Sequence, residues 1–218
     1  MASDSAIPYF ERRHTVKMPT RAQTLLSRIC FPVLAVLSRE QSLKLRLVPV
    51  DDERVIMALK FARGRVLDVG CGSNTFVRSY GNGVGVDVVE WEGCDQVIED
   101  AASLPFEDGS FDTVSFLACL NHIANRDLAV REAYRVLKPG GQVLLTMIPP
   151  RIGAFTHWLR ERNDPDHRER SIDHSSELMG MSARDIRSIL LAAGFRDPIR
   201  RRFVFGLNSI FVARRPTG

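Results

Sequence analysis

The sequence predicts an α/β fold in which a mostly parallel sheet is covered by helices on both faces. Two observations indicate this fold. From residue 51 onward, short apolar runs alternate with helix-like segments, as in parallel sheets. The apolar run 66–69 then breaks into Gly-Cys-Gly at 70–72, a tight turn whose backbone can approach a ligand closely. The 218 residues suffice for one well-buried domain with about fifty residues left for appendages.

The N-terminal region is predicted to be helical and to lie outside the sheet. Residues 1–19 show no sustained periodicity, so we expect an arm there. Residues 20–41 are predicted to be helical with a break near Pro32, because proline interrupts helices. We therefore divide the chain into an N-terminal arm and helical lid (1–50) and a main domain (51–218).

The main domain is predicted to begin with a helix that Asp51-Asp52 caps and that runs to about Phe61. Buried strands are expected at 65–69, 83–87, 95–99, 111–117 and 142–148. A helix over 126–137 should end at Lys138-Pro139-Gly140-Gly141, which combines a basic last turn with helix-breaking residues. After an interruption at 149–181, the pattern predicts a helix at 182–193 and strands at 199–205 and 208–213.

The glycine turn and the next strand predict a nucleoside site. A helix opening at Ser73 would aim its free N–H groups at a ligand. A dinucleotide fingerprint requires a third glycine where Thr75 stands, which argues against a pyrophosphate. Asp87 ends the next apolar run, nineteen residues after Asp68, and is well placed to bind both hydroxyls of a ribose.

Five ordered blocks resemble one family. They are Val66 to Gly72, Gly85-Val86-Asp87, Glu99-Asp100-Ala101, Leu104 to Asp112 and Arg131 to Gly141. In this order they resemble class I S-adenosylmethionine-dependent methyltransferases, most of all the group with the ubiquinone/menaquinone C-methyltransferases. The resemblance is close over about 50–148. It implies a Rossmann-like three-layer sandwich with seven strands, the last antiparallel beside the fifth, and a substrate-pocket insertion at 149–181.

The resemblance also implies S-adenosylmethionine as cofactor and assigns roles around it. Asp68 would meet the ammonium of the methionine part, directly or through water, and Asp87 would bind the ribose. Turn or cap formation is the alternative role for both, and Glu99 is an alternative to Asp100 at the adenine edge. The predicted cofactor-binding residues are Asp68, Gly70, Cys71, Gly72, Asp87, Val88, Asp100, Ala101 and Leu117.

Methyl transfer from a sulfonium is a one-step displacement, so the protein mainly aligns the reactants and removes a proton. We predict no metal and no covalent nucleophile. His122, at the exit of the fourth strand, is the first candidate base, with a structural role in the turn as the alternative. His174 is our choice among the histidines of the 149–181 insertion. Core packing is expected for Cys119, which lacks the Pro-Cys context of a nucleophile.

Composition limits the compartment and the partners. The four cysteines have no disulfide or metal-ligand spacing and no signal peptide is visible, so we expect a cytoplasmic protein. The apolar stretch 25–37 is too short to span a bilayer, which needs about 20 residues, although it leaves peripheral membrane contact open. Net charge is +4, and residues 1–50 hold eight Lys/Arg against three Asp/Glu. The basic residues at both ends of the chain are typical of nucleic-acid binding, but the sequence shows no recognition module, so a nucleic-acid partner is not expected.

The predicted function is methyl transfer from S-adenosylmethionine to a small-molecule acceptor, at a hydroxyl. C-methylation of a quinone-like or lipid ring is the alternative reaction. Two alternatives come from other classes: an RNA-binding or RNA-modifying protein, and a non-catalytic subunit that binds the cofactor.

Overall fold

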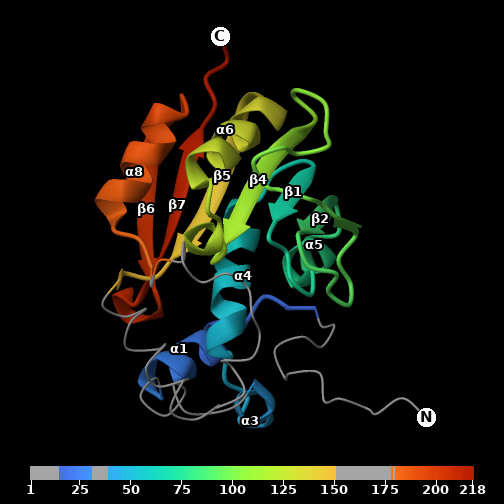
Figure 1. Ribbon diagram of the computed structural model, residues 1–218. Helices are drawn as coiled ribbons and strands as arrows, with labels where there is room; N and C mark the ends of the chain where they lie inside the picture. Colours follow the sequence, from blue (N-terminus) through green and yellow to red (C-terminus); the bar gives the residue numbers. More distant parts are fainter. Residues whose placement is uncertain (1–14, 31–38, 151–177, 179) are drawn as a thin grey trace, which may run out of the picture.

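A computed structural model describes residues 15–30, 39–150, 178 and 180–218, and it has three layers (Figure 1). The described residues form one seven-stranded sheet in the order β3-β2-β1-β4-β5-β7-β6. Its strands are β1 (Val66–Val69), β2 (Gly83–Asp87), β3 (Gln96–Val97), β4 (Phe111–Leu117), β5 (Leu137–Met147), β6 (Arg196–Phe203) and β7 (Asn208–Arg214). β7 is antiparallel to both neighbours, whereas the pairs formed among β1 to β5 are parallel. The predicted fold class is confirmed.

Helices cover both faces of the sheet. The helices are α1 (Arg21–Ile29), α3 (Arg39–Lys44), α4 (Val50–Phe61), α5 (Thr75–Tyr80), α6 (Arg126–Val136) and α8 (Ala183–Ala192), with short 3-10 turns η2 (Leu120–His122) and η5 (Val204–Gly206). One apolar core packs α6 and α8 against the sheet, and a second packs α4 and α5 against the opposite face. The strand ends between these layers are where α/β folds bind ligands.

Two predicted helix starts are wrong. α4 begins at Val50 after Pro49 and has no side-chain cap, so Asp51 and Asp52 lie inside its first turn. α5 begins at Thr75 rather than Ser73, because Asn74 adopts a left-handed conformation before the helix. By contrast, the helix predicted at 182–193 is observed to within one residue at each end, and Ser182 is its N-cap, whose hydroxyl accepts from the Asp185 N–H.

The fifth strand also differs from its prediction. It starts at Leu137, not 142, and includes Lys138-Pro139-Gly140-Gly141. Leu137 pairs with Phe111 before a register shift, and regular pairing resumes at Gln142 with Thr113. Proline is tolerated here because the irregular start of the strand does not need its N–H for a regular ladder. The helix α6 ends as predicted to within one residue, at Val136.

The N-terminal region is tied to the α4–α5 face of the sheet. Val16 is buried in the core beneath α4 and α5, and its N–H donates to the Ser79 hydroxyl at 2.8 Å. The Ser27 hydroxyl of α1 accepts from the Val48 N–H at 2.8 Å. Within the described residues, no helix combines the length and apolar character needed to cross a membrane.

Candidate cofactor and acceptor site

The glycine turn after β1 is fixed to β2 by the backbone. The N–H groups of Gly70 and Cys71 both donate to the Val86 carbonyl, at 2.9 and 3.0 Å. Gly70 and Gly72 have φ angles of +72° and +51°, which side chains rarely tolerate. A Cβ on Gly70 would lie 2.8 Å from Cys119 Sγ, whereas the space in front of Gly72 is open. The turn is therefore rigid on one side and leaves room for a ligand beside Gly72.

Asp87 closes this turn from the end of β2. Its Oδ2 accepts from the Gly72 N–H at 2.9 Å, and its Oδ1 accepts from the Val89 N–H at 3.1 Å. The side chain is 9% exposed, so it is held in place but not sealed off. A carboxylate oriented in this way retains lone pairs that can accept from two neighbouring hydroxyls.

These groups open into a cavity of about 430 Å³. Its described lining includes Gly70, Gly72, Asp87, Val88, Asp100, Ala101 and His122 from the predicted set. The cavity lies in the size range of small-molecule sites, about 300–1,000 Å³, and combines apolar walls with a few polar groups. It fits a nucleoside-containing cofactor, with the open side of Gly72 available for close backbone approach.

Three predicted cofactor residues do not line this cavity. Asp68 is 2% exposed, and its Oδ1 accepts from the Ser115 hydroxyl at 2.6 Å. Cys71 Sγ contacts Cys94 Sγ at 3.7 Å instead of the cavity. Leu117 packs against the core on the α4 side. A contact of Asp68 with the cofactor thus requires an intermediary such as water.

The buried carboxyl of Asp68 has an unusual acidity. Burial raises the pKa of Asp68 from 3.8 to about 7, the hydrogen bond from Ser115 opposes the rise, and the charge of Asp87 adds to it. Burial also raises the pKa values of the Cys71 and Cys119 thiols, and the nearby Asp68 and Asp87 charges add to both effects. These thiols are protonated at neutral pH and are therefore poor nucleophiles.

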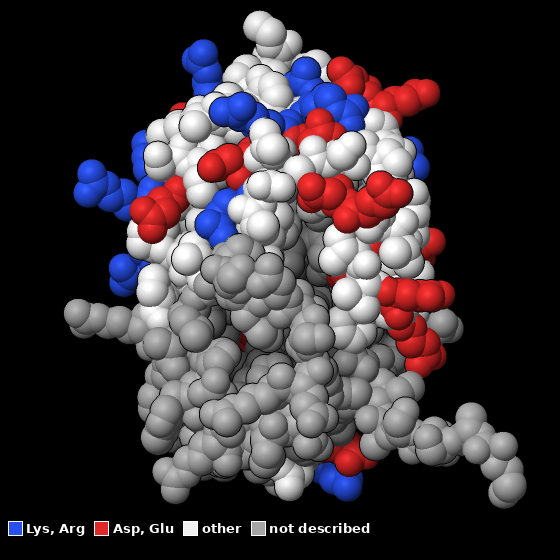
Figure 2. Space-filling model, in the orientation of Figure 1, with Lys and Arg blue, Asp and Glu red and all other residues white. Residues whose placement is uncertain are grey.

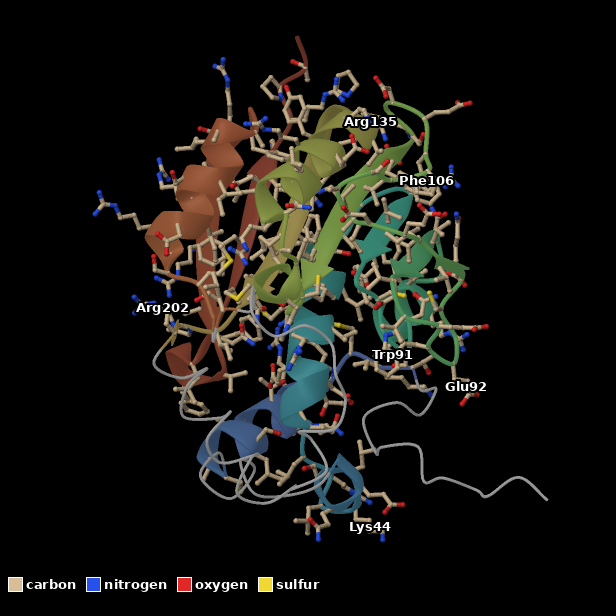
Figure 3. The ribbon with its side chains drawn as sticks, in the orientation of Figure 1. Lys44, Trp91, Glu92, Phe106, Arg135 and Arg202 are labelled. Atoms are coloured by element: carbon tan, nitrogen blue, oxygen red, sulfur yellow. The ribbon has the colours of Figure 1, made fainter. Side chains whose placement is uncertain are left out.

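The loop that carries Asp100 is fixed to α6. Asp100 Oδ1 accepts from the Ala102 N–H at 2.9 Å. Further along this loop, the Arg135 guanidinium donates to the carbonyls of Phe106 and Leu104, at 2.8 and 3.0 Å (Figure 3). Glu132 accepts from Arg135 and from the Leu104 N–H, and the Arg135 hydrogen bonds lower the pKa of Glu132. The cation and the carboxylate together fix the segment 104–106, which follows the lining residues Asp100 and Ala101.

His122 lies at the rim of the cavity, in η2 after β4. Asn121 Nδ2 lies 3.0 Å from His122 Nε2 and 3.0 Å from the Leu178 carbonyl. Because an amide nitrogen only donates, His122 Nε2 accepts this hydrogen bond and the ring proton is on Nδ1. Asn121 therefore orients the imidazole. His174, the second candidate base, lies outside the described residues, as does most of the predicted 149–181 insertion.

Several lining residues were missed by the sequence reading. They are Val69, Val89, Trp91, Ile98, Cys119, Ile123 and Ala124. Trp91 lies in the loop beyond Asp87 (Figure 3), and an aromatic residue so soon after the acid expected to bind the ribose was an available signal. Cys119 was expected in the core, but its Sγ bonds to the Val69 carbonyl at 2.9 Å while the residue also lines the cavity.

The charge distribution bears on a nucleic-acid partner. On the face shown in Figure 2, acidic side chains gather along the side where β2 and its loops lie. Of the C-terminal arginines, Arg215 donates to the carbonyls of Tyr134, Arg135 and Leu137, and its guanidinium lies 4.8 Å from the Tyr134 ring centroid. Arg215 therefore satisfies the carboxyl end of α6 instead of forming part of a free basic surface.

Comparison with known proteins gives matches over the same elements. The family described as "Methyltransferase domain" matches residues 67–145, from β1 into β5. Probable tRNA methyltransferase 9B of Mus musculus is 30% identical over 92 residues, covering 37% of this chain and 21% of that protein. Demethylmenaquinone methyltransferase of Thermus thermophilus is 47% identical over 57 residues, 26% of each chain. The chain thus spans about a quarter of the length of these relatives.

Solved structures agree on the fold. An S-adenosylmethionine-dependent methyltransferase from Thermotoga maritima has a TM-score of 0.57 at 20% identity and covers 75% of this chain and 88% of its own. The family match runs from β1 through β2, β4 and η2 into β5, so it includes the strand ends that build the cavity. Residues 67–145 thus match a methyltransferase domain, the fold is shared with solved S-adenosylmethionine-dependent methyltransferases, and both findings support S-adenosylmethionine as the cofactor.

Proposed function

We propose that the chain transfers a methyl group from S-adenosylmethionine to a hydroxyl of a small-molecule acceptor. The observation that carries this proposal is that one cavity brings together Gly72, Asp87 and His122. The first two would hold the cofactor, and the third is a titratable side chain at the rim, where an acceptor would approach. When bound, the cofactor supplies an electrophilic methyl group, and the chain has to align the acceptor and accept its proton.

In this proposal His122 is the base and Asn121 positions it. The lone pair on His122 Nε2 now accepts from Asn121. Proton transfer from a hydroxyl to Nε2 therefore requires the imidazole to exchange this hydrogen bond for one from the acceptor. Asn121 is anchored to Leu178 in both directions, since the Leu178 N–H donates to the Asn121 carbonyl at 3.1 Å. The Asn121 side chain is thus held in one position and orients the His122 imidazole.

A carbon of a quinone-like ring is the second candidate acceptor. It is favoured by the Thermus thermophilus relative, whose name specifies demethylmenaquinone. A hydroquinone ring activates its own carbon by ionising, so this reaction depends less on a protein base. A tRNA acceptor is suggested by the name of the probable tRNA methyltransferase 9B relatives from Mus musculus, Homo sapiens and Bos taurus. Location in the cytoplasm remains part of the proposal and is supported by four free cysteines.

Product analysis separates these candidates. The protein is incubated with S-adenosylmethionine carrying an isotope-labelled methyl group and, in separate reactions, a catechol-type aromatic, a short-chain demethylmenaquinol and bulk tRNA. We expect label in the first acceptor, with the chemical shift of an O-methyl group. Label on a ring carbon would replace the hydroxyl proposal by C-methylation. Label in tRNA, lost steeply as salt rises, would refute the small-molecule acceptor.

A further inference from the structure

A second cavity, of about 610 Å³, lies between α1, α4 and the segment from the end of β6 through η5. It shares no described lining residue with the cofactor cavity. Arg202 of its lining and Trp91 of the cofactor cavity lie on opposite sides of the molecule in Figure 3. As far as the described residues go, the two cavities therefore have separate linings.

The floor of this cavity is apolar. Val48 and Phe203 are buried members of the core beneath α4, and Met57 and Phe61 of α4 pack beside them. A cavity with such walls excludes a fully hydrated ion but gains free energy when a hydrocarbon chain displaces water.

The described lining also carries three cationic side chains, Lys60, Arg201 and Arg202. Lys60 Nζ contacts Met57 Sδ at 3.9 Å, and none of the three cations forms an ion pair with another described residue. Glu53 is the one acidic residue in the described lining, and it has an interaction of its own. Among the described lining residues, three cations therefore stand against one carboxylate beside an apolar floor.

Arg200, the residue before these two arginines in β6, differs from them because its side chain has partners within the protein. Arg200 Nε donates to the Ser209 hydroxyl at 3.0 Å, and its guanidinium lies 5.7 Å from the Phe211 ring centroid. Phe211 belongs to the core on the α6–α8 face, whereas Ile210, the partner of Arg201, belongs to the α4 face. Arg200 thus faces away from the cavity and is not in its described lining. Arg202 shares the face of Arg200 by alternation, but it lies at the end of the strand beside η5, where its Cδ would be 3.8 Å from a Cβ on Gly206 of the lining.

A strained turn forms part of the same cavity. Val204 and Phe205 have φ angles of +47° and +53°, and the left-handed region is unfavourable for both, most of all for β-branched valine. Phe205 is 60% exposed although it is a large aromatic residue. Strained backbone that presents an exposed apolar side chain at a cavity is the kind of outlier that points to ligand contact.

We propose that this cavity binds an amphipathic anion, a single hydrocarbon chain that ends in a carboxylate or phosphate group. The chain would lie on Met57, Phe61 and Phe203, and the head group would pair with Arg201 and Arg202 at the end of β6. Guanidinium groups suit this task because they pair with both anions in two-point geometry and are weakly hydrated. The assignment is independent of the acceptor in the methyl-transfer site.

Calorimetry with three matched amphiphiles tests the proposal on the full-length protein. Dodecanoate, dodecyltrimethylammonium and dodecanol are titrated below their micellar concentrations. We expect saturable binding of dodecanoate at one equivalent, weaker binding of the alcohol and none of the cation. The double variant Arg201→Gln/Arg202→Gln should lower dodecanoate affinity about tenfold, on the order expected for two solvent-accessible charge pairs. Added salt should weaken binding to the parent protein.

Two further variants make the test specific. Arg196→Gln removes an exposed arginine of the same strand outside the described lining, so it should leave dodecanoate affinity unchanged. Phe205→Gly removes the ring and relieves the strained φ, so it should weaken dodecanoate binding without loss of thermal stability. Affinity for S-adenosylmethionine should stay constant in all variants, which shows that the domain is folded.

Four outcomes would overturn the proposal. Equal binding of the cationic and anionic amphiphiles would leave only an apolar cavity. Inorganic phosphate that binds as tightly as dodecanoate would remove the role of the chain. Binding to phosphatidylglycerol vesicles without binding of monomeric dodecanoate would indicate a membrane-contact surface instead. An effect of Arg196→Gln as large as that of the double variant would indicate general electrostatic attraction.

Discussion

Replacement of Asp87 by alanine tests the cofactor site most directly. The carboxylate accepts from the N–H groups of Gly72 and Val89, at 2.9 and 3.1 Å, while it faces the cavity. Asp87→Ala removes the expected acceptor for the ribose and the hydrogen bond that holds the Gly72 N–H. A hydrogen bond to a charged group contributes about 1.5–3 kcal/mol, so Kd for S-adenosylmethionine should rise roughly 10- to 150-fold.

Asp95 provides a matched control for this variant. Its Oδ2 accepts from Asn74 Nδ2 and from the Gly85 N–H, at 2.7 and 2.8 Å, but it is not in the described lining of the cavity. Asp95→Ala should therefore lower the melting temperature while it keeps most of the cofactor affinity. Calorimetry measures the affinity, and Trp91 at the cavity gives a fluorescence signal. Unchanged affinity in Asp87→Ala, or an equal loss in both variants, would refute the assignment.

Three further predictions concern the base, the buried carboxyl and the arm. His122→Ala should lower turnover by about 10²–10⁴-fold with little change in melting temperature, and a stability loss without a rate effect would favour a structural histidine. Because the pKa of Asp68 is raised to about 7, the folded state binds a proton that the unfolded state releases near pH 4. The free energy of unfolding that Asp68 contributes should therefore decrease as the pH rises from about 4 to 7. Asp68→Asn should lack this pH-dependent decrease when its denaturation is measured across the same range. Deletion of residues 1–14 should reduce turnover or acceptor affinity but not cofactor affinity, whereas deletion of 1–19 should also lower the melting temperature because it removes buried Val16. If calorimetry showed that a folded protein without residues 1–14 no longer binds the cofactor, the hypothesis that the arm is a lid over the acceptor site would be refuted.

The order of strands and helices could be predicted because burial patterns are local. Apolar runs bounded by glycine and acidic residues marked β2 and β4 with their observed bounds. The antiparallel pairing of β7 with β5 was not contained in those runs. It followed from the family resemblance, since alternation alone does not tell a strand which neighbour it pairs with or in which direction.

The helix starts near the site depended on distant partners. Asn74 Nδ2 donates to the Gly93 carbonyl and to Asp95, residues 19 and 21 positions further along the chain. These contacts fix Asn74 in its left-handed conformation, so the helix starts after it. A cap rule that considers only the neighbouring sequence would favour Ser73, because the competing hydrogen bonds are formed by tertiary structure.

Which side chains face the cavity and which face the core was the least predictable part of the site. Cys71 lies between two glycines of the turn, yet its thiol faces Cys94 from the loop after β2. Leu117 ends β4 but faces the α4 core, whereas Cys119, two residues later, reaches the cavity. The left-handed Ala118 between them, with φ of +58°, reverses the direction in which the chain presents its side chains. Such a reversal has no signature in residue type.

The two carboxylates at the ends of β1 and β2 show how one sheet gives similar residues different chemistry. The parallel register pairs Asp68 with Gly85 and puts Asp87 one residue beyond the last paired position. Asp68 is therefore enclosed by neighbouring strands and has a raised pKa, while Asp87 lies past the end of β1, although it still pairs with Val97 of β3, and accepts two backbone N–H groups. A cationic ammonium near Asp68 would favour its charged form, so cofactor binding should release a proton from this residue below about pH 7. The two carboxyls are the same residue type, so their different depth in the sheet explains the difference in acidity; we expect Asp87 to hold neutral hydroxyls and Asp68 to respond to charge.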